Sequence, residues 1–331
     1  MENEFGVVLA RTPSGPIDPS DFALRKVVPP SLSDGEVLIR PDYISLDPYL
    51  AIQVYGRPVR GTILKPGDAL RSRMVGTVVE SRHPGFSAGD QVRGIGPWQS
   101  LFAMAGSELE KLPHLALSAY YHLSVLGTPG ITAWIGLHRI GRIKSGETII
   151  VSGASGTIGS IAGQLARRQG CKVFGIAGGD AKCAHARDAL GFHACLNHRK
   201  QDFAARLKEI EAQVYFENVG GNLLDAVLPA LCDHARIVLC GMIAHYDKDK
   251  THQFRNLHML LEKAIDVRPY RVSEHAEHHG EAMRELAEGF ADGSVTCTHT
   301  LTHGLETAPE AFAAMMRGEA LGKSIVQVGA A

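Results

Sequence analysis

A short apolar run, a glycine turn and a helix-forming segment follow one another near the middle of the chain. Thr148–Ser152 favours a buried strand, and a helix is expected to open shortly after it. A strand that leads into a helix through such a turn directs backbone N–H groups and the positive end of the helix dipole to one point, where a dinucleotide diphosphate binds. The residues that the pattern assigns to this cofactor site are Gly153, Gly156, Thr157, Ile158 and Gly159.

The three glycines have separate roles in this pattern. Gly153 permits the tight turn, Gly156 lets the backbone approach the phosphates, and Gly159 lets the helix pack closely on the strand. A glycine triplet alone also serves ordinary turns. The strand before it and the helix after it are what make a dinucleotide site the favoured interpretation.

Composition places the chain among ordinary globular proteins. It has 331 residues, enough for two domains, with 45% hydrophobic and 21% charged residues. With 34 basic and 35 acidic residues the net charge is −1, so no overall field attracts nucleic acid or an anionic membrane. The first residues lack the apolar segment of a secretory signal, and no apolar run is long enough to span a bilayer. We therefore expect a cytoplasmic protein with no nucleic-acid or membrane partner.

Neither the cysteines nor the histidines favour a metal site. No two cysteines lie two or three positions apart, so zinc-ribbon spacing is missing and reduced, buried thiols are expected. His275 and His279 would share one face of a helix, which invites a metal interpretation. The surrounding 274–285 segment is rich in charge, however, and a solvated helix face is the stronger expectation. We predict no bound metal.

The pattern of expected strands and helices divides the chain into two domains. Residues 1–117 contain short strand-like runs between turn signals, such as Glu36–Arg40, which indicates an antiparallel, partly barrel-like domain. Over residues 118–290, strands such as Lys172–Ala177 alternate with helices, which predicts a doubly wound parallel sheet and an α/β fold. Residues 291–331, with a helix and a final strand, are assigned back to the first domain.

Five segments form a pattern more specific than the glycine triplet: Tyr43–Tyr49, Gly127–Trp134, Phe216–Gly221, Cys240–Tyr246 and Leu321–Lys323. Together they resemble the medium-chain dehydrogenase/reductase superfamily, and within it the zinc-free, NADPH-dependent double-bond reductases. The resemblance implies a GroES-like, mainly-β catalytic domain, a Rossmann cofactor domain and a homodimer. Zinc-dependent relatives carry a Cys ligand where this chain has Ser45, and a Gly-His-Glu segment where it has Arg73–Val75.

The second strand of the predicted Rossmann domain bears on the choice of cofactor. Asp180 lies about 20 positions past the glycine turn, where an acidic residue usually marks NAD. The strand tip itself is glycine, so we expect Asp180 beyond the tip, as the N-cap of the next helix. Gly178 then leaves room for a 2′-phosphate, and NADPH is the expected cofactor.

Basic residues support this choice. The resemblance implies that Lys182 grips the 2′-phosphate. A second matching position usually reads Asn-Tyr, and here it is Asn197-His198, followed by Arg199. Histidine and arginine can both pair with a phosphate dianion. The alternative is that Lys182 and Arg199 are solvated surface charges.

Three further residues are assigned to the cofactor, Asn218 among them by the resemblance. Asn218 ends a strand, where its amide would hydrogen-bond a ribose; the alternative is an Asn that closes a turn. Gly241 follows the next strand. The Thr132 hydroxyl would lie near the nicotinamide, or else bond to its own helix backbone.

Reduction of an activated C=C bond requires a hydride at the β-carbon, stabilisation of the enolate and a proton for the α-carbon. Tyr246 matches the family tyrosine that binds the substrate or donates the proton, and the alternative is a loop aromatic packed beside His245. Tyr49 and Trp98 are candidate walls of an apolar pocket, although the protein core is the better expectation for Trp98.

Several positions depart from the family pattern, and these departures bear on which substrate the protein takes. Thr128 replaces a Met, and Ala320 replaces an Asn that would touch the cofactor. The loop after Tyr246 lacks the usual prolines. Arg268 and Arg271 replace apolar residues, which predicts a more cationic entrance and a substrate other than the long lipid enones.

Three functions are compatible with these residues. The leading hypothesis is an NADPH-dependent reductase of α,β-unsaturated ketones or aldehydes. A quinone reductase would use the same hydride donor without a proton donor for the α-carbon. A non-catalytic NADPH-binding sensor or partner protein is the alternative from another class.

Overall fold

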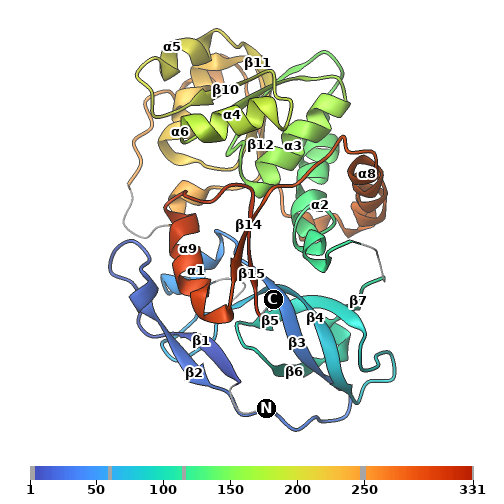
Figure 1. The fold of residues 1–331 in the computed structure, drawn as a ribbon. Coiled ribbons are helices and arrows are strands. Elements are labelled where there is room, and N and C mark those ends of the chain that lie inside the picture. Colours follow the sequence, from blue (N-terminus) through green and yellow to red (C-terminus); the bar gives the residue numbers. More distant parts are fainter. Residues whose placement is uncertain (1–3, 59–61, 114–116, 247–250, 330–331) are drawn as a thin grey trace. The chain divides into compact units, whose positions relative to one another are not determined.

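The computed structural model describes residues 4–58, 62–113, 117–246 and 251–329, and the chain forms two compact units (Figure 1). Unit 1 comprises Met1–Leu123 and His299–Ala331, and unit 2 comprises Ser124–Thr298. Both borders lie a few residues later than the 117/118 and 290/291 expected from the sequence. The loop after Tyr246, where missing prolines were noted, lies partly outside the described residues.

Local packing explains where the borders fall. Gln164 of unit 2 donates to the Thr296 carbonyl at 2.9 Å and accepts from the Thr296 N–H at 2.9 Å, which holds the segment after residue 290 to unit 2. The 3-10 turn η3 (Ala119–Leu123) instead packs on unit 1, where its last residue lies in a buried cluster with Val75 and Ile325.

Unit 2 contains a six-stranded parallel sheet in the order β10-β9-β8-β11-β12-β13. Its strands are β8 (Thr148–Ser152), β9 (Lys172–Ala177), β10 (Ala194–Asn197), β11 (Ala212–Glu217), β12 (Leu231–Leu239) and β13 (Asp266–Pro269). Ile149, Ile150 and Val151 in β8 are fully buried, as expected for a strand covered on both faces. This confirms the doubly wound α/β prediction, and the strand order reverses between β8 and β11, where such folds bind their ligands.

Helices alternate with these strands. They are α2 (Thr128–Ile135), α3 (Thr157–Arg168), α4 (Asp180–Asp188), α5 (Phe203–Lys208), α6 (Gly221–Val227), α7 (Met259–Glu262) and α8 (His279–Ala291). A π-helical turn, η4 (Gly136–Gly141), continues α2. His275 lies between the 3-10 turns η7 (Val272–Glu274) and η8 (Ala276–His278), so it does not share a helix with His279 as the sequence suggested.

Unit 1 is mainly β, which confirms the predicted second fold element. The hairpin β1 (Phe5–Leu9) and β2 (Phe22–Lys26) accompanies a larger sheet in the order β14-β15-β3-β4-β5-β7, with β6 also paired to β3. The strands of this sheet are β3 (Glu36–Ser45), β4 (Arg71–Ser81), β5 (Gln91–Pro97), β6 (Phe102–Ala105), β7 (Glu110–Lys111), β14 (His299–His303) and β15 (Lys323–Gln327). Its helices include α1 (Leu50–Val54) and α9 (Ala308–Met316). Ile325 of β15 pairs with Ser45 of β3, so the end of the chain adds a strand to this sheet.

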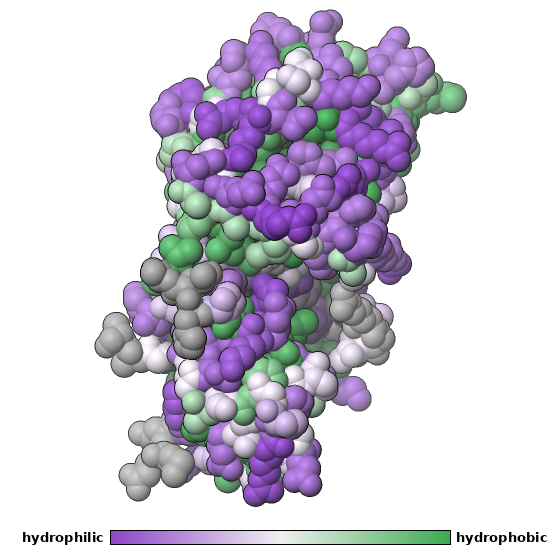
Figure 2. Space-filling model, turned by 90° about the vertical axis from the view of Figure 1, so that its right-hand side faces the viewer, coloured by the Kyte–Doolittle hydropathy of each residue, from purple (hydrophilic) through white to green (hydrophobic). Residues whose placement is uncertain are grey.

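The viewed face in Figure 2 is largely hydrophilic, with smaller apolar areas among the polar residues. In the described part of the chain, no helix has the length and apolar character needed to cross a membrane. All six cysteines are free thiols, and Cys171 and Cys183 are buried. Across the described ranges, no three His, Cys, Asp or Glu side chains group so as to hold a metal ion.

Candidate functional site

The glycine turn joins β8 to α3 without room for side chains. Gly153 has φ of 59°, a left-handed conformation that favours glycine, and its carbonyl accepts the Gly156 N–H at 2.9 Å. A Cβ atom at Gly159 would lie 2.3 Å from the Gly153 carbonyl oxygen, so only glycine permits this approach of helix to turn. Gly156 is the N-cap of α3, and Thr157 and Ile158 begin the helix. The first N–H groups of a helix have no acceptor within it, and this geometry suits a diphosphate.

A buried carboxyl group, Glu217, connects this turn to the neighbouring strand end. Its Oε1 accepts the Ser152 hydroxyl at 2.7 Å and the Gly220 N–H at 3.0 Å. Asn218 completes the connection: its backbone N–H donates to the Ser152 hydroxyl and its side-chain amide to the Ser152 carbonyl, both at 2.8 Å. A Cβ at Gly153 would lie 3.7 Å from the Asn218 Cβ, so the structure brings these two predicted residues together.

The backbone of Glu217 also contacts the end of a third strand, β12. Its carbonyl accepts the N–H groups of Cys240 at 2.9 Å and Gly241 at 3.0 Å. Burial raises the pKa of the Glu217 carboxyl above its ordinary value. No role was predicted for Glu217, although a charged residue at the end of an apolar strand is a signal that could have identified it.

Three basic residues surround the tip of β9. A Cβ at Gly178 would lie 2.9 Å from Nε2 of His198 and 3.5 Å from Nε of Arg199. Partial burial and the Arg199 charge both lower the pKa of Lys182, and the same two causes lower the pKa of His198. The charges of Lys182 and Arg199 lie close enough together to act on one anion, and the phosphate role stays a prediction.

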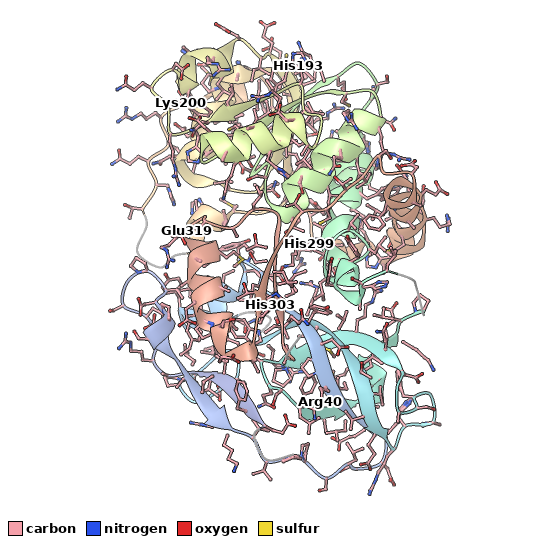
Figure 3. All side chains as sticks on the ribbon, viewed as in Figure 1. Arg40, His193, Lys200, His299, His303 and Glu319 are labelled. Atoms are coloured by element: carbon pink, nitrogen blue, oxygen red, sulfur yellow. The ribbon has the colours of Figure 1, made fainter. Side chains whose placement is uncertain are left out.

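Asp180 does not cap the helix, so that expectation was wrong. The N-cap of α4 is Gly179, and Asp180 is the first helical residue. Its carboxylate accepts the Asn197 side-chain amide at 3.0 Å and lies 3.0 Å from the Lys200 ammonium, and these contacts lower its pKa. Lys200, labelled in Figure 3, follows β10 in the chain. The Asp180 charge is thereby matched by Lys200.

Tyr246 follows a loop that is hydrogen-bonded to the residues just after β11. The Ile243 N–H donates to the Asn218 carbonyl at 3.3 Å, and the Ala244 N–H donates to the Val219 carbonyl at 2.8 Å. Burial raises the pKa of Tyr246, so the phenol stays protonated at neutral pH and can donate a proton or a hydrogen bond.

The Thr132 hydroxyl donates to the Thr128 carbonyl one turn earlier, at 2.7 Å. This bond to its own helix backbone is the alternative that was expected for Thr132. The Thr132 carbonyl in turn accepts the Tyr270 hydroxyl at 2.7 Å. A hydroxyl that donates to its own helix still has lone pairs to offer a ligand.

In unit 1, the two candidate pocket walls differ. Trp98 is fully buried and its indole N–H donates to the Ser72 hydroxyl at 2.9 Å, so it belongs to the core. Tyr49 is partly exposed, and the guanidinium carbon of Arg73 lies 5.8 Å from its ring centre.

A charge network links the ends of β3, β4 and β15. Asp47 accepts the Ser45 hydroxyl at 2.8 Å and the Lys323 ammonium at 2.6 Å, and Arg73 lies 3.5 Å away. Burial would raise the pKa of Asp47, but the charges of Lys323 and Arg73 outweigh it and hold that pKa below its usual value. Asp47 and Lys323 lie in two of the segments that resemble the family, but no role was predicted for either residue.

Arg268 and Arg271 do not provide the surplus positive charge that was expected of them. Arg268 pairs with Asp266 at 2.7 Å, and Arg271 pairs with Glu274. Since each arginine has its own carboxylate, their contribution to a cationic entrance is small.

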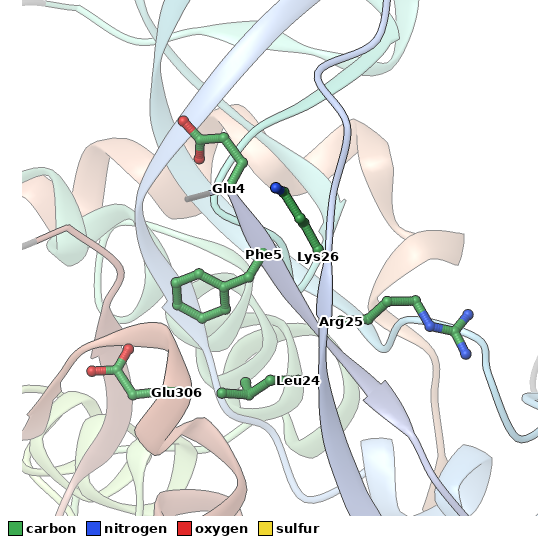
Figure 4. Close-up of a pocket in the computed structure, with 6 residues that line it drawn as sticks. All are labelled: Glu4, Phe5, Leu24, Arg25, Lys26 and Glu306. Atoms are coloured by element: carbon green, nitrogen blue, oxygen red, sulfur yellow. The ribbon is translucent and has the colours of Figure 1, made fainter. Parts of the chain in front are cut away.

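Two surface recesses hold none of the predicted cofactor or catalytic residues. Within the described residues, one of about 530 Å³ lies at the β1–β2 hairpin (Figure 4) and is lined by Glu4, Phe5, Leu24, Arg25, Lys26 and Glu306. Another of about 470 Å³ lies in unit 2 and is lined by Arg139, Ile140, Arg142, Asp266, Arg268 and Pro269. Both are open surface depressions, and neither touches the glycine turn.

Two family models match the chain. Residues 6–112 match the model described as the N-terminal domain of oxidoreductase, and residues 157–288 match the one described as zinc-binding dehydrogenase.

Full-length relatives also match. The chain is 35% identical to the NADPH-dependent curcumin reductase of Escherichia coli, over 97% of this chain and 96% of that protein. It is 35% identical to mouse prostaglandin reductase 1 over 93% and 94%, and 32% identical to the NADP⁺-dependent 2-alkenal reductase of Nicotiana tabacum over 97% and 96%. The crystal structure of CurA from Vibrio vulnificus in complex with NADPH superposes with a TM-score of 0.93 at 34% identity, covering 99% of this chain and 100% of that one.

Proposed function

We infer that this chain, which belongs to the zinc-independent double-bond reductases of the medium-chain dehydrogenase/reductase superfamily, reduces the C=C bond of α,β-unsaturated ketones or aldehydes with NADPH. The observation that carries this function is the pairing of a glycine turn at β8 with the basic cluster around Gly178. The turn suits a diphosphate, and the cluster suits the additional phosphate that distinguishes NADPH from NADH.

Each half of the cofactor has residues proposed to hold it. The turn Gly153–Gly159, with Thr157 and Ile158, would bind the diphosphate. Around the tip of β9, Lys182, His198 and Arg199 would bind the 2′-phosphate beside Gly178, and Asn197 would support them. The nicotinamide half is assigned to Asn218, Gly241 and Thr132.

NADPH supplies the hydride for the β-carbon when it is bound. Tyr246 would donate the proton for the α-carbon or hold the substrate carbonyl, because its phenol stays protonated at neutral pH. Tyr49 would form part of the substrate-binding wall.

Two finer properties are also proposed. Membership in this family supports a homodimer, and the near-zero net charge is compatible with a cytoplasmic location. Light scattering on the purified protein tests the first, and a fluorescent fusion in the host cell tests the second.

The experiment that tests the function incubates the purified protein with NADPH, a small neutral enone and, separately, a quinone. We expect NADPH oxidation with the enone and a saturated carbonyl product in the mass spectrum. Oxidation with the quinone alone would instead support a quinone reductase. Tight NADPH binding without oxidation would support a sensor or partner protein.

A further inference from the structure

His198 lies over a bare stretch of backbone at the tip of β9. It follows β10 directly, and its N–H donates to the Ala177 carbonyl at 3.1 Å, which fixes its backbone beside the last residue of β9. The side chain reaches across Gly178, where a Cβ atom would lie 2.9 Å from Nε2 of the imidazole. This nitrogen therefore faces the backbone beside which the 2′-phosphate is proposed to bind.

Arg199 approaches the same point from the next position in the chain. A Cβ at Gly178 would lie 3.5 Å from both Nε and Nη2 of its guanidinium. A phosphate group beside Gly178 would thus have an imidazole nitrogen and a guanidinium edge near it. An arginine keeps its charge at every pH that a protein tolerates, whereas a histidine changes its charge near neutral pH. A pH-dependent contact with the phosphate would therefore come from His198.

The surroundings of His198 favour its neutral form. Partial burial lowers the pKa of the imidazole and the charge of Arg199 lowers it further, against a smaller opposite effect of a hydrogen bond to its own backbone. On the neighbouring helix α4, Lys182 is basic as well, and the Asp180 carboxylate lies 3.0 Å from the Lys200 ammonium. Before the cofactor binds, the imidazole is thus mostly uncharged at neutral pH.

A phosphate dianion changes this balance. A phosphate monoester carries about −1.5 to −2 charges at pH 7, and an opposite charge within about 4–6 Å favours the protonated imidazole. The proton comes from the solvent, and no bond of the cofactor breaks. NADH has a hydroxyl in place of the 2′-phosphate, so it offers the imidazole no such charge.

We propose that His198 is a specificity-determining residue whose imidazole takes up a proton when the 2′-phosphate binds, so that affinity for NADPH falls as pH rises while affinity for NADH does not. This inference rests on the proposed function and its assignment of the 2′-phosphate to the tip of β9. The sign follows from linkage, because the complex keeps the proton up to a higher pH than the free protein does. The additional affinity is present below that interval and is lost as pH rises through it.

The test measures cofactor binding without a substrate. The Kd values for NADPH and NADH are obtained by fluorescence titration from about pH 6 to about pH 8.5, and calorimetry in two buffers of different ionisation enthalpy counts the protons taken up. The wild type is compared with His198→Gln and His198→Tyr, which remove the imidazole but keep a hydrogen-bonding group. His193→Gln is the matched control, because His193 is exposed just before β10 and packs against Phe174, with ring centres 5.0 Å apart (Figure 3).

We expect the wild-type Kd for NADPH to rise about tenfold across this range, since a shift of one pKa unit corresponds to a tenfold change in affinity. His198→Gln should lose this rise, so its Kd should match the wild type at the alkaline end and be about tenfold higher at the acidic end. Near neutral pH, the wild type should take up more protons per bound NADPH than either His198 variant. Titration of the phosphate itself contributes to all four proteins alike, and the Kd for NADH should stay constant.

Several results would overturn the inference. An equal pH dependence and equal proton uptake in the wild type and His198→Gln would do so and leave the proposed function intact. The same pH dependence for NADH would also do so, as would a His193→Gln variant that behaves like His198→Gln. If His198→Gln does not fold, His198→Tyr decides by the same comparison. A wild type that binds NADPH no more tightly than NADH at any pH overturns the assignment of the 2′-phosphate and this inference together.

Discussion

Ser152 at the end of β8 donates its hydroxyl to the buried carboxyl of Glu217 at the end of β11, at 2.7 Å. The same carboxyl accepts the Gly220 N–H, and the Glu217 carbonyl accepts the Gly241 N–H. One residue thereby fixes three strand ends at the edge of the sheet where the cofactor is proposed to bind.

Glu217→Leu should therefore weaken both the fold and cofactor binding. It leaves buried donors without an acceptor, and each such donor costs about 1–3 kcal/mol. We expect a lower free energy of unfolding in urea and an increased Kd for NADPH. Glu217→Gln, which keeps an acceptor oxygen, should be milder in both measurements; equal damage from the two variants would contradict the role given to the oxygen.

The pH dependence of Glu217→Gln follows from the raised pKa of the native carboxyl. Above the ordinary glutamate pKa the unfolded chain releases its proton while the folded chain retains it, so wild-type stability falls as pH rises through this interval. The variant lacks this loss. The free energy of unfolding of the variant should therefore increase relative to that of the wild type as pH rises from acidic to neutral. Urea unfolding at each pH measures this difference. A difference that stays constant with pH would show that Glu217 is ionised in the native state.

Cofactor choice should depend on Lys182 and Arg199. Charge-assisted hydrogen bonds contribute about 1.5–3 kcal/mol, so Lys182→Ala or Arg199→Ala should raise the Kd for NADPH by about 10- to 100-fold and leave that for NADH nearly unchanged. Lys200→Ala is the control, because that ammonium pairs with Asp180. Fluorescence titration with both nucleotides checks this, and an equal loss of NADH affinity would argue against a 2′-phosphate role.

Tyr246→Phe separates the two enzymatic hypotheses. Loss of a general acid costs about 100- to 10,000-fold, so turnover of an enone should fall steeply. A quinone needs no proton at an α-carbon, and its reduction should change little. Steady-state rates for both substrates, with Tyr121→Phe as a control, test this; an unchanged enone rate would remove Tyr246 from the chemistry.

The sequence predicted those structural features that depend on a local residue pattern. Strands β8 and β9 have the predicted bounds, because a run of branched apolar residues between turn signals is specific for a buried strand. The predicted cap at Asp180 failed, because nearby Lys200 and Asn197 offered its carboxylate stronger partners than the helix backbone. The pair Asp47–Lys323 joins residues 276 positions apart, and no local pattern carries that contact.

His299 should make the fold sensitive to acid. It packs edge-on against Tyr120, with ring centres 4.7 Å apart, and burial, with a contribution from the Lys323 charge, lowers its pKa to about 4. As pH falls from neutral, the unfolded chain takes up a proton near the ordinary histidine pKa of about 6.5, while the folded chain does not until about 4. Stability from this residue is therefore present above pH 6.5 and is lost as pH falls through that interval.

His299→Phe should remove this loss and keep the aromatic packing. His303→Phe is the control, because that histidine lies in the same strand, β14, and is exposed; Figure 3 labels both residues. Urea unfolding between neutral and acidic pH should show a shallower fall in stability for His299→Phe than for the wild type or the control. If all three curves fall in parallel, His299 is protonated in the folded protein over this range, and acid sensitivity arises from other groups.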